Sequence, residues 1–181
     1  MGKVVLYIAT SIDGLIARSD GSLDWLESLP NPDNTDYGYQ NLLNGCDSIV
    51  MGKSTYDRLL TYGMEWPYAD FKTFVVSRKV DFVPSTAKTC MLNADIDTCI
   101  RNHTSQSDKD MWLVGGGKLM NYFLLNNLID KMIIAIVPVI LGAGIPMFPD
   151  VSIQSDWQLE GVESSKSGIV SLTYIRRKCV E

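Results

Sequence analysis

The sequence predicts an α/β fold: a three-layer αβα sandwich around a mostly parallel central sheet, with a C-terminal antiparallel hairpin. Apolar, β-branched runs alternate with segments of helical periodicity, which is typical of a parallel sheet covered by helices. The last two runs, 157–164 and 169–176, alternate polar and apolar residues around a turn at Lys166-Ser-Gly168, a hairpin pattern. The chain has 181 residues, 46% of them hydrophobic, and shows no linker or repeat, so we expect a single domain over residues 1–181.

The individual elements follow from local patterns along the chain. Residues 3–9 form a nearly continuous apolar run, which indicates a strand covered on both faces. Ser22 is suited to cap a short helix, and Gly45 is suited to end a longer one. We expect strands at residues 3–9, 47–51, 71–77, 88–92, 110–114 and 131–138. We expect helices at residues 22–29, 33–44, 52–62, 95–103 and 118–125.

Three consecutive glycines, Gly115, Gly116 and Gly117, stand between the strand at 110–114 and the helix at 118–125. Glycine adopts backbone conformations that are closed to other residues, and it lets a ligand approach the backbone closely. The helix start that follows offers unpaired N–H groups and the positive end of a dipole, so this junction favours a phosphate-bearing ligand. An ordinary tight turn is the alternative.

A second junction, Gly52-Lys-Ser-Thr55, resembles part of the phosphate loop of NTPases. The full motif requires a glycine where this chain has Asp47, and the residues before Gly52 are strand-like, so we exclude such a loop. A glycine, a lysine and two hydroxyls at a helix start still make an anion site, and two such sites suit a dinucleotide. Ser77 and Arg78 follow another strand and suit the 2′-phosphate of NADP, unless they form only a solvated turn.

Composition argues against several other classes. The formal net charge is -5, from 16 Lys and Arg against 21 Asp and Glu, which disfavours a nucleic-acid binder. No apolar run is long enough to span a membrane and no secretory cleavage pattern is present, so we expect a cytoplasmic protein. The only histidine, His103, lies at a polar helix end, where we expect it at the surface. No cysteine pair has zinc-site spacing, so we expect no metal and free thiols at Cys46, Cys90, Cys99 and Cys179.

Residues 139–148 form an apolar segment that contains two glycines and is bracketed by prolines. This pattern indicates either the wall of an apolar pocket or an ordinary packed loop, and both readings stay open.

Several motifs occur in order and at suitable spacing. They are Ser11-Ile-Asp-Gly14, Ile49-Val-Met-Gly-Lys-Ser-Thr-Tyr56, Val75-Val-Ser-Arg78, Leu113-Val-Gly-Gly-Gly-Lys118 and Pro138-Val-Ile-Leu-Gly-Ala-Gly-Ile-Pro-Met-Phe148. Together they resemble the dihydrofolate reductase superfamily over roughly residues 3–176, so we expect a dihydrofolate reductase-like form of the fold. The first and last motifs resemble the reductase domain of riboflavin-biosynthesis proteins, the RibD C-terminal family. The second motif is closer to dihydrofolate reductase itself.

The resemblance implies NADPH bound across the carboxyl edge of the sheet and hydride transfer to a C=N or C=O carbon. It implies that the pyrophosphate and adenosine side is met by Gly52, Lys53, Ser54 and Thr55, and the 2′-phosphate by Ser77 and Arg78. It implies that the rest of the cofactor is wrapped by Val114, Gly115, Gly116, Gly117, Lys118 and Leu119. Ala9, Ile16 and the loop at 13–15 would border the nicotinamide. Family members often have a cis peptide between the first two of the three glycines.

Two carboxylates are candidates for the substrate side. Asp36 falls, counted back without a gap, where dihydrofolate reductases carry an acidic residue early in a helix. There it would hold an amino group of a pyrimidine or pterin, although the helix dipole alone also favours an acid at this place. Asp13 is the alternative polar contact for the substrate, or it only stabilises a turn.

We therefore expect an NADPH-dependent reductase that acts on a small heterocycle. The loop at 138–148 favours 5-amino-6-(5-phosphoribosylamino)uracil of riboflavin biosynthesis over dihydrofolate. However, residues 42–45 lack the arginine that the riboflavin branch uses for the ribosyl phosphate, the zinc-ligand spacing of its deaminase domain is missing, and no clear arginine serves the glutamate tail of folate. Dihydrofolate reductase and a non-catalytic NADP-binding protein are the alternatives. By resemblance we expect a homodimer with the terminal hairpin as its contact, and no nucleic-acid or membrane partner.

Overall fold

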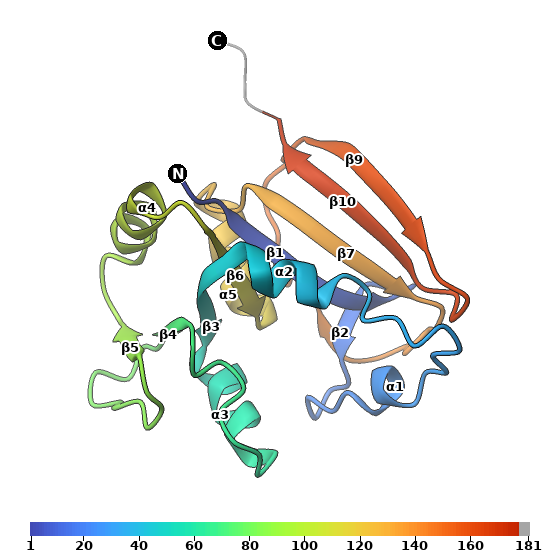
Figure 1. Ribbon diagram of the computed structural model, residues 1–181, viewed down its shortest axis with the longest axis horizontal. Coiled ribbons are helices and arrows are strands. Elements are labelled where there is room, and N and C mark those ends of the chain that lie inside the picture. The colour runs from blue at the N-terminus through green and yellow to red at the C-terminus, as the bar shows by residue number, and fades with distance from the viewer. Residues whose placement is uncertain (178–181) are drawn as a thin grey trace.

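The computed structural model describes residues 1–177, and Cys179 lies outside them. Its main strands are β1 Val4–Ser11, β3 Cys46–Gly52, β4 Lys72–Val76, β5 Thr89–Leu92, β6 Asp110–Gly115, β7 Lys131–Val137, β9 Trp157–Ser164 and β10 Val170–Arg176. They form an eight-stranded sheet in the order β5-β4-β3-β6-β1-β7-β10-β9 (Figure 1). In this order the strands from β5 to β7 are parallel, whereas β10 pairs antiparallel with both of its neighbours, β7 and β9. The mostly parallel sheet with a terminal hairpin is confirmed.

Helices cover both faces of this sheet (Figure 1). They are α1 Asp24–Glu27, α2 Tyr39–Gly45, α3 Lys53–Thr61, α4 Ile96–Gln106 and α5 Gly117–Leu125. Leu42 of α2 and Tyr56 of α3 are buried together with Met51 of β3 on one face, here called the front face. Ile100 of α4 and Phe123 of α5 are buried in a separate cluster on the back face. The three-layer αβα arrangement is therefore confirmed.

β1 lies at the centre of the sheet, as its apolar sequence predicts. Leu6 is fully buried and pairs with Leu113 of β6 on one side and with Met132 of β7 on the other. Burying one such aliphatic side chain contributes about 1.5–3 kcal/mol, so this central strand anchors the neighbours that carry the glycine junctions.

A second, two-stranded sheet joins β2 Leu15–Ala17 to β8 Ile145–Pro146. The sequence predicts only a loop at β8, because a strand of two residues has no periodicity to detect. Gly144 lies against β2 so closely that a Cβ there would stand 2.2 Å from the carbonyl oxygen of Ala17. The apolar segment thus packs along the turn that follows β1.

The predicted helix at 33–44 is wrong in its first part, because α2 begins only at Tyr39. Tyr37 and Gly38 have φ angles of 56° and 88°, which belong to the left-handed region and break a helix. Asp36 therefore lies before the helix, in the loop. The predicted helix at 22–29 is also shorter, since α1 spans only Asp24–Glu27.

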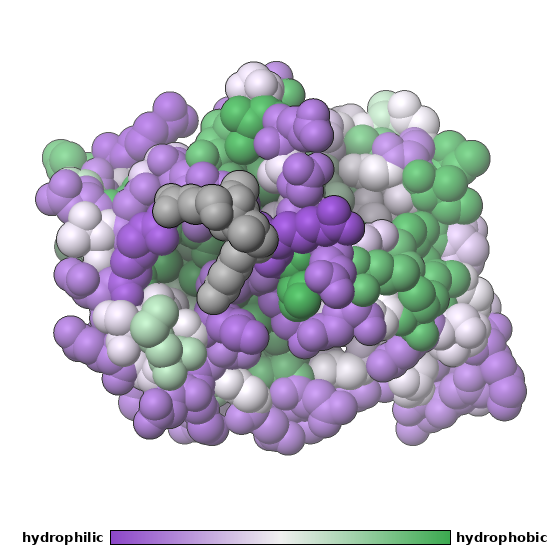
Figure 2. Space-filling model, turned by 90° about the horizontal axis from the view of Figure 1, so that it is seen from above, coloured by the Kyte–Doolittle hydropathy of each residue, from purple (hydrophilic) through white to green (hydrophobic). Residues whose placement is uncertain are grey.

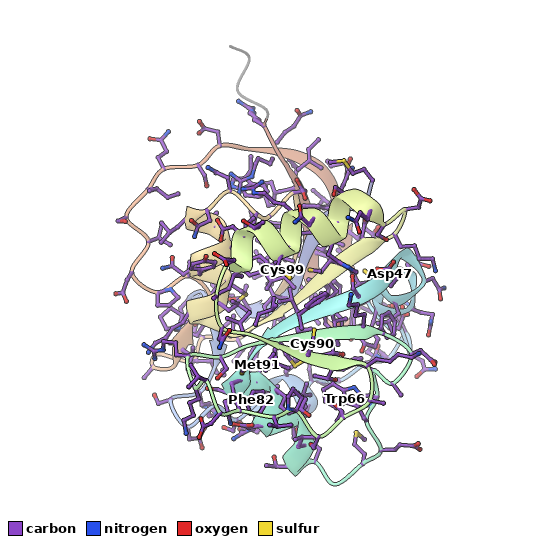
Figure 3. The ribbon with its side chains drawn as sticks, turned by 90° about the vertical axis from the view of Figure 1, so that its left-hand side faces the viewer. Asp47, Trp66, Phe82, Cys90, Met91 and Cys99 are labelled. Carbon is purple, nitrogen blue, oxygen red and sulfur yellow. The ribbon has the colours of Figure 1, made fainter. Side chains whose placement is uncertain are left out.

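The expectation that His103 lies at the surface is wrong. Its side chain is 19% exposed, and its ring packs edge-on against Phe74 with 5.0 Å between centroids. Burial lowers the pKa of this imidazole below its usual value. Cys46, Cys90 and Cys99 are free thiols, and Figure 3 shows the last two on β5 and α4.

β9 is an edge strand of the main sheet. Leu159 and Val162 on this strand are 49% and 58% exposed. Figure 2, seen from above, shows hydrophobic side chains gathered among polar ones on the side where β9 and β10 lie. Within residues 1–177, no helix is long and apolar enough to cross a membrane, and no cluster of His, Cys, Asp and Glu could hold a metal ion.

Candidate cofactor and substrate site

The two glycine junctions lie side by side at the carboxyl edge of the sheet. β3 and β6 are neighbours, and Met51 at the end of β3 pairs with Gly115 at the end of β6. A Cβ on Gly116 would stand 3.3 Å from Oγ1 of Thr55, and one on Gly52 would stand 3.9 Å from the carbonyl oxygen of Gly115. Residues 52–55 and 115–118 therefore form one surface, here called the glycine cradle.

Glycine is required at two places in this cradle. Gly115 has a φ of 124°, which other residues rarely adopt, and its peptide bond to Gly116 is cis. A Cβ on Gly117 would stand 2.6 Å from the carbonyl oxygen of Pro146 and 3.2 Å from Cδ of Pro149. The start of α5 thus touches the segment that contains β8. Helices α3 and α5 both begin here, and the first N–H groups of a helix have no partner within it.

The side chains of the cradle residues differ in what they offer. Nζ of Lys53 lies 2.5 Å from Oδ2 of Asp57 and 4.8 Å from the ring centroid of Phe82, so its charge is held along α3. Ser54 and Lys118 are exposed and Thr55 is half-buried. Leu119 is buried in the back-face core, and Val114 is half-buried against the front-face cluster. Neither of these two apolar side chains points freely to solvent at the cradle.

Ser77 and Arg78 lie at the same edge, directly after β4, which is the next neighbour of β3. Ser77 is buried, and its hydroxyl accepts a hydrogen bond from the amide of Lys79 at 3.0 Å. Arg78 is exposed. The Arg78 side chain is thus exposed at this edge, whereas the Ser77 hydroxyl shapes the turn that carries it.

Asp13 ties together two segments that border the carboxyl edge. Its carboxylate accepts hydrogen bonds from the amides of Leu141 and Gly142 at 3.1 and 2.8 Å. The amide of Met147 also donates to the carbonyl of Gly14 at 3.0 Å. A hydrogen bond from the Ser11 side chain, and then those from the two amides, lower the pKa of Asp13 to about 2. The 138–148 segment is therefore fixed to the turn after β1.

The two apolar residues expected at the nicotinamide flank this turn. Ala9 packs against the cluster around Trp25 and Ala135, and Ile16 packs against the back-face core. The turn between them is the one that Asp13 fixes, so Ala9, Asp13 and Ile16 belong to one corner of the molecule.

Asp36 is exposed in the loop before α2. Its carboxylate accepts hydrogen bonds from the amide of Gln40 at 2.8 Å and from that of Gly38 at 3.0 Å, and these bonds lower its pKa. Asp36 lines neither of the two cavities on the front face, although its neighbour Tyr37 lines both. In this position Asp36 caps the start of α2.

A cavity of about 230 Å³ opens on the front face beside Ala9. It is lined by Tyr7, Ala9, Leu26, Tyr37, Ala135 and Ile169, and we call it the apolar pocket. Ala9 and Ala135 pair directly across β1 and β7. Sequence reasoning found only Ala9 of these residues. The alternation of Val5, Tyr7 and Ala9 along β1 was the available signal for Tyr7, but Leu26, Tyr37 and Ile169 come from loops or distant elements.

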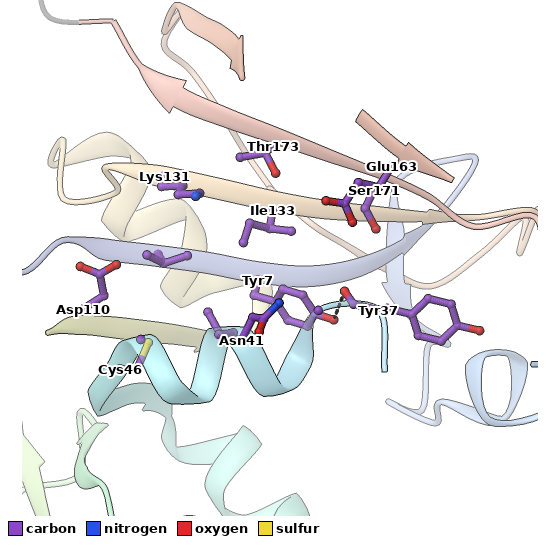
Figure 4. A pocket seen from close by; sticks show the side chains of 14 residues that line it. Tyr7, Tyr37, Asn41, Cys46, Asp110, Lys131, Ile133, Glu163, Ser171 and Thr173 are labelled. Carbon is purple, nitrogen blue, oxygen red and sulfur yellow. Dashed lines mark hydrogen bonds between the residues drawn. The ribbon is translucent and has the colours of Figure 1, made fainter. Parts of the chain in front are cut away.

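A second cavity of about 280 Å³ runs along α2, and we call it the α2 groove. Its walls are α2, the loop before it, and residues of β1, β3, β6, β7, β9 and β10 (Figure 4). It meets the apolar pocket at Tyr7 and Tyr37, which line both, and the Tyr7 hydroxyl donates to the carbonyl of Tyr37 at 3.2 Å. Burial, and then the charge of Asp36, raise the pKa of Tyr7 to about 12, so this phenol stays protonated at neutral pH.

Comparison with known proteins identifies the family. A family model described as the RibD C-terminal domain matches residues 2–171. The chain belongs to the RibD C-terminal domain family. The resemblance inferred from the sequence motifs is therefore confirmed.

Relatives of this RibD C-terminal family member share its sequence over nearly the whole chain. It is 32% identical over 174 residues to the uncharacterised protein YwjB of Bacillus subtilis (strain 168), covering 96% of this chain and 98% of that protein. The crystal structure of a candidate riboflavin biosynthesis protein from Shewanella sp. PV-4 matches with a TM-score of 0.88 and 32% identity, covering 97% and 99% of the two chains.

A more distant structure shows the same fold. A dihydrofolate reductase from Enterococcus faecalis, complexed with NADP(H) and RAB-propyl, matches with a TM-score of 0.70 at 14% identity and covers 98% of both chains. The dihydrofolate reductase-like form of the αβα sandwich is thus confirmed for this RibD C-terminal family member.

Proposed function

We propose that this protein is an NADPH-dependent reductase that transfers hydride to a small heterocyclic substrate. The observation that carries the proposal is the glycine cradle: two helix starts that meet at Gly116 and Thr55, beside an apolar pocket that contains Ala9. A pair of helix N-termini suits the two phosphates of a dinucleotide, because their free N–H groups and dipoles favour negative charge. The NADP(H) complex of a dihydrofolate reductase with the same fold supports the choice of cofactor.

The residues of the cradle fit such a cofactor. The amides at the start of α3, from Gly52 to Thr55, would meet one phosphate, with the hydroxyls of Ser54 and Thr55 beside them. The amides from Gly115 to Lys118 would bind the other phosphate. Val114 and Leu119 would contribute their backbone groups and the packing of their side chains. Arg78 would bind the 2′-phosphate of NADPH, and Ser77 would hold the Arg78 turn in place through its bond to Lys79.

The protein's own part in the chemistry is to position the cofactor and the acceptor and to exclude water. NADPH, when bound, would supply the hydride. Ala9 and Ile16 would border the nicotinamide, and Asp13 would keep the 138–148 segment closed against that corner. The apolar pocket would hold the acceptor ring against Ala9 in a setting that admits little water, which raises the effective concentration of the reacting atoms.

The substrate is the finer part of the proposal. The family and the Shewanella relative support a role in riboflavin biosynthesis, with a ribosylated aminouracil as acceptor. Dihydrofolate is the alternative acceptor. Asp36 lies close enough to influence the pKa of Tyr7, so we keep it as the proposed contact for a substrate amino group, and Asp13 as a positioning group.

The test is a titration with NADPH followed by a turnover assay. Binding should quench the fluorescence of the reduced nicotinamide, and an aminopyrimidine or pterin should then cause its oxidation. A protein that binds NADPH but oxidises it with none of these acceptors would be the non-catalytic alternative. In that case Asp36→Asn would change no rate, whereas a substrate contact predicts a loss of kcat/KM of about tenfold or more.

Three expectations about the whole molecule remain predictions: a single domain, a cytoplasmic location and a homodimer. The exposed Leu159 and Val162 on edge strand β9 support a contact through the hairpin. Light scattering of the purified protein at several concentrations would give the oligomeric state.

A further inference from the structure

The two front-face cavities form one path that starts at the proposed nicotinamide corner. The apolar pocket contains Ala9, and the α2 groove continues from it past Tyr7 and Tyr37 toward the amino edge of the sheet. An acceptor whose ring occupies the apolar pocket would direct its substituent along the α2 groove. The lining of the groove therefore decides which substituents the protein accepts. This reasoning rests on the proposed function.

The residues that line the apolar pocket offer no charge to the ring. None of its six lining residues is an Asp, Glu, Lys, Arg or His. The Tyr7 hydroxyl is already used by the carbonyl of Tyr37, and the Tyr37 hydroxyl donates to Oγ of Ser167 at 3.2 Å. A pocket of this kind favours a neutral, planar ring, because an ion there would lose its hydration without a partner.

The α2 groove carries more negative than positive charge. Its described lining contains two acids, Asp110 and Glu163, and one base, Lys131. Nζ of Lys131 lies 3.5 Å from Oε2 of Glu160, a further acid on β9, so its charge is already partly neutralised. A phosphate dianion in this groove would face Glu163 and Asp110 with no arginine to bind it, which is unfavourable.

The neutral polar groups of the groove suit a different substituent. Asn41, Ser171 and Thr173 line it, and Figure 4 marks no hydrogen bond from these three side chains to another lining residue. Figure 4 shows Asn41 on α2 across from Ser171 and Glu163 on the hairpin. Amide, hydroxyl and carboxylate groups of this kind pair well with the hydroxyls of a sugar or polyol chain.

We propose that the acceptor is an uncharged, unphosphorylated heterocycle with a hydroxylated side chain, its ring in the apolar pocket and its hydroxyls in the α2 groove. The protein would thus act on the dephosphorylated counterpart of a ribosylated aminouracil. Glu163 is the residue that most directly rejects a terminal phosphate, because it faces the groove from the strand opposite α2.

The test compares one compound with and without its phosphate: 5-amino-6-(ribosylamino)uracil and its 5′-phosphate. Binding is measured by calorimetry on the wild-type protein saturated with oxidised cofactor, and turnover is measured with NADPH. The unphosphorylated form should be preferred by about tenfold or more in Kd and in kcat/KM. Equal or tighter binding of the phosphate, or binding of neither compound, would overturn the proposal. Failure of the proposed function appears separately, as loss of cofactor binding in the same protein.

A charge-reversal pair gives the matched control. Glu163→Lys should raise kcat/KM or affinity for the phosphorylated compound about tenfold relative to the unphosphorylated one. Glu65→Lys changes the net charge equally at a residue that does not line the groove, and it should leave the ratio unchanged. If both variants shift the ratio alike, the preference reflects overall charge and the groove assignment is wrong.

Discussion

Replacing Gly117 by alanine probes the contact between the glycine cradle and the 138–148 segment. The new Cβ would stand 2.6 Å from the carbonyl oxygen of Pro146, a backbone atom that cannot move without displacing β8. Overpacking of this kind typically costs about 1–3 kcal/mol. For a protein of this size 1 kcal/mol corresponds to a shift of about 2–4 °C, so Tm should fall by about 2–12 °C. Because the cradle opens, NADPH should also bind about tenfold more weakly.

Gly45→Ala is the matched control for this substitution. Gly45 ends α2, and a Cβ there would meet no atom within 4 Å. Alanine favours helix over glycine by up to about 1 kcal/mol, so Tm should stay the same or rise, and NADPH affinity should not change. Differential scanning calorimetry and fluorescence titration measure both quantities. A Gly117→Ala protein with the Tm and cofactor affinity of the wild type would refute the close contact and its link to the cradle.

Three further predictions concern charged groups at the site. Arg78→Ala should reduce the preference for NADPH over NADH by about tenfold, because the proposed partner of the 2′-phosphate is lost; equal preference in wild type and variant would contradict this. Lys118→Ala should weaken NADPH binding several-fold at low ionic strength and less at high salt, and a salt-independent loss would indicate a different cause. Asp13 has a pKa lowered from 3.8 to about 2, so its bonds stabilise the fold above pH 4 and are lost as the pH falls through about 2. Asp13→Asn should remove that part of the acid dependence of Tm, and an unchanged profile would show that the carboxylate does not hold the segment.

Local sequence patterns were enough to predict the features that follow directly from a parallel sheet. β1 is a continuous apolar run because both its faces are covered, and the glycines at the ends of β3 and β6 stand where these parallel strands end. Since neighbouring parallel strands end at one edge, the sequence also implied that the two junctions would meet, and the pairing of Met51 with Gly115 bears this out. The order of the strands in the sheet depends on long-range contacts, so no local sequence pattern predicted it.

Other parts of the site had no local signal. The apolar pocket joins Tyr7, Leu26 and Ile169, which are far apart in the chain, so no window of sequence contains it. The helical spacing of apolar residues across 33–44 predicted a helix through Tyr37 and Gly38. The left-handed turn there was missed because Tyr37 is not a residue type that predicts positive φ. That error placed Asp36 inside a helix, whereas it precedes the helix and binds its first amides.

The most direct test of the account is the thermal stability of the wild-type protein with and without NADPH. A ligand at ~100 times its Kd stabilises the folded state by about 2.7 kcal/mol. In a protein of this size that raises Tm by about 5–11 °C. The account predicts a rise of this order with NADPH and a smaller one with NADH at the same concentration. If neither NADPH nor NADP⁺ shifts Tm at saturating concentration, the glycine cradle does not bind the cofactor and the proposed reductase function is wrong.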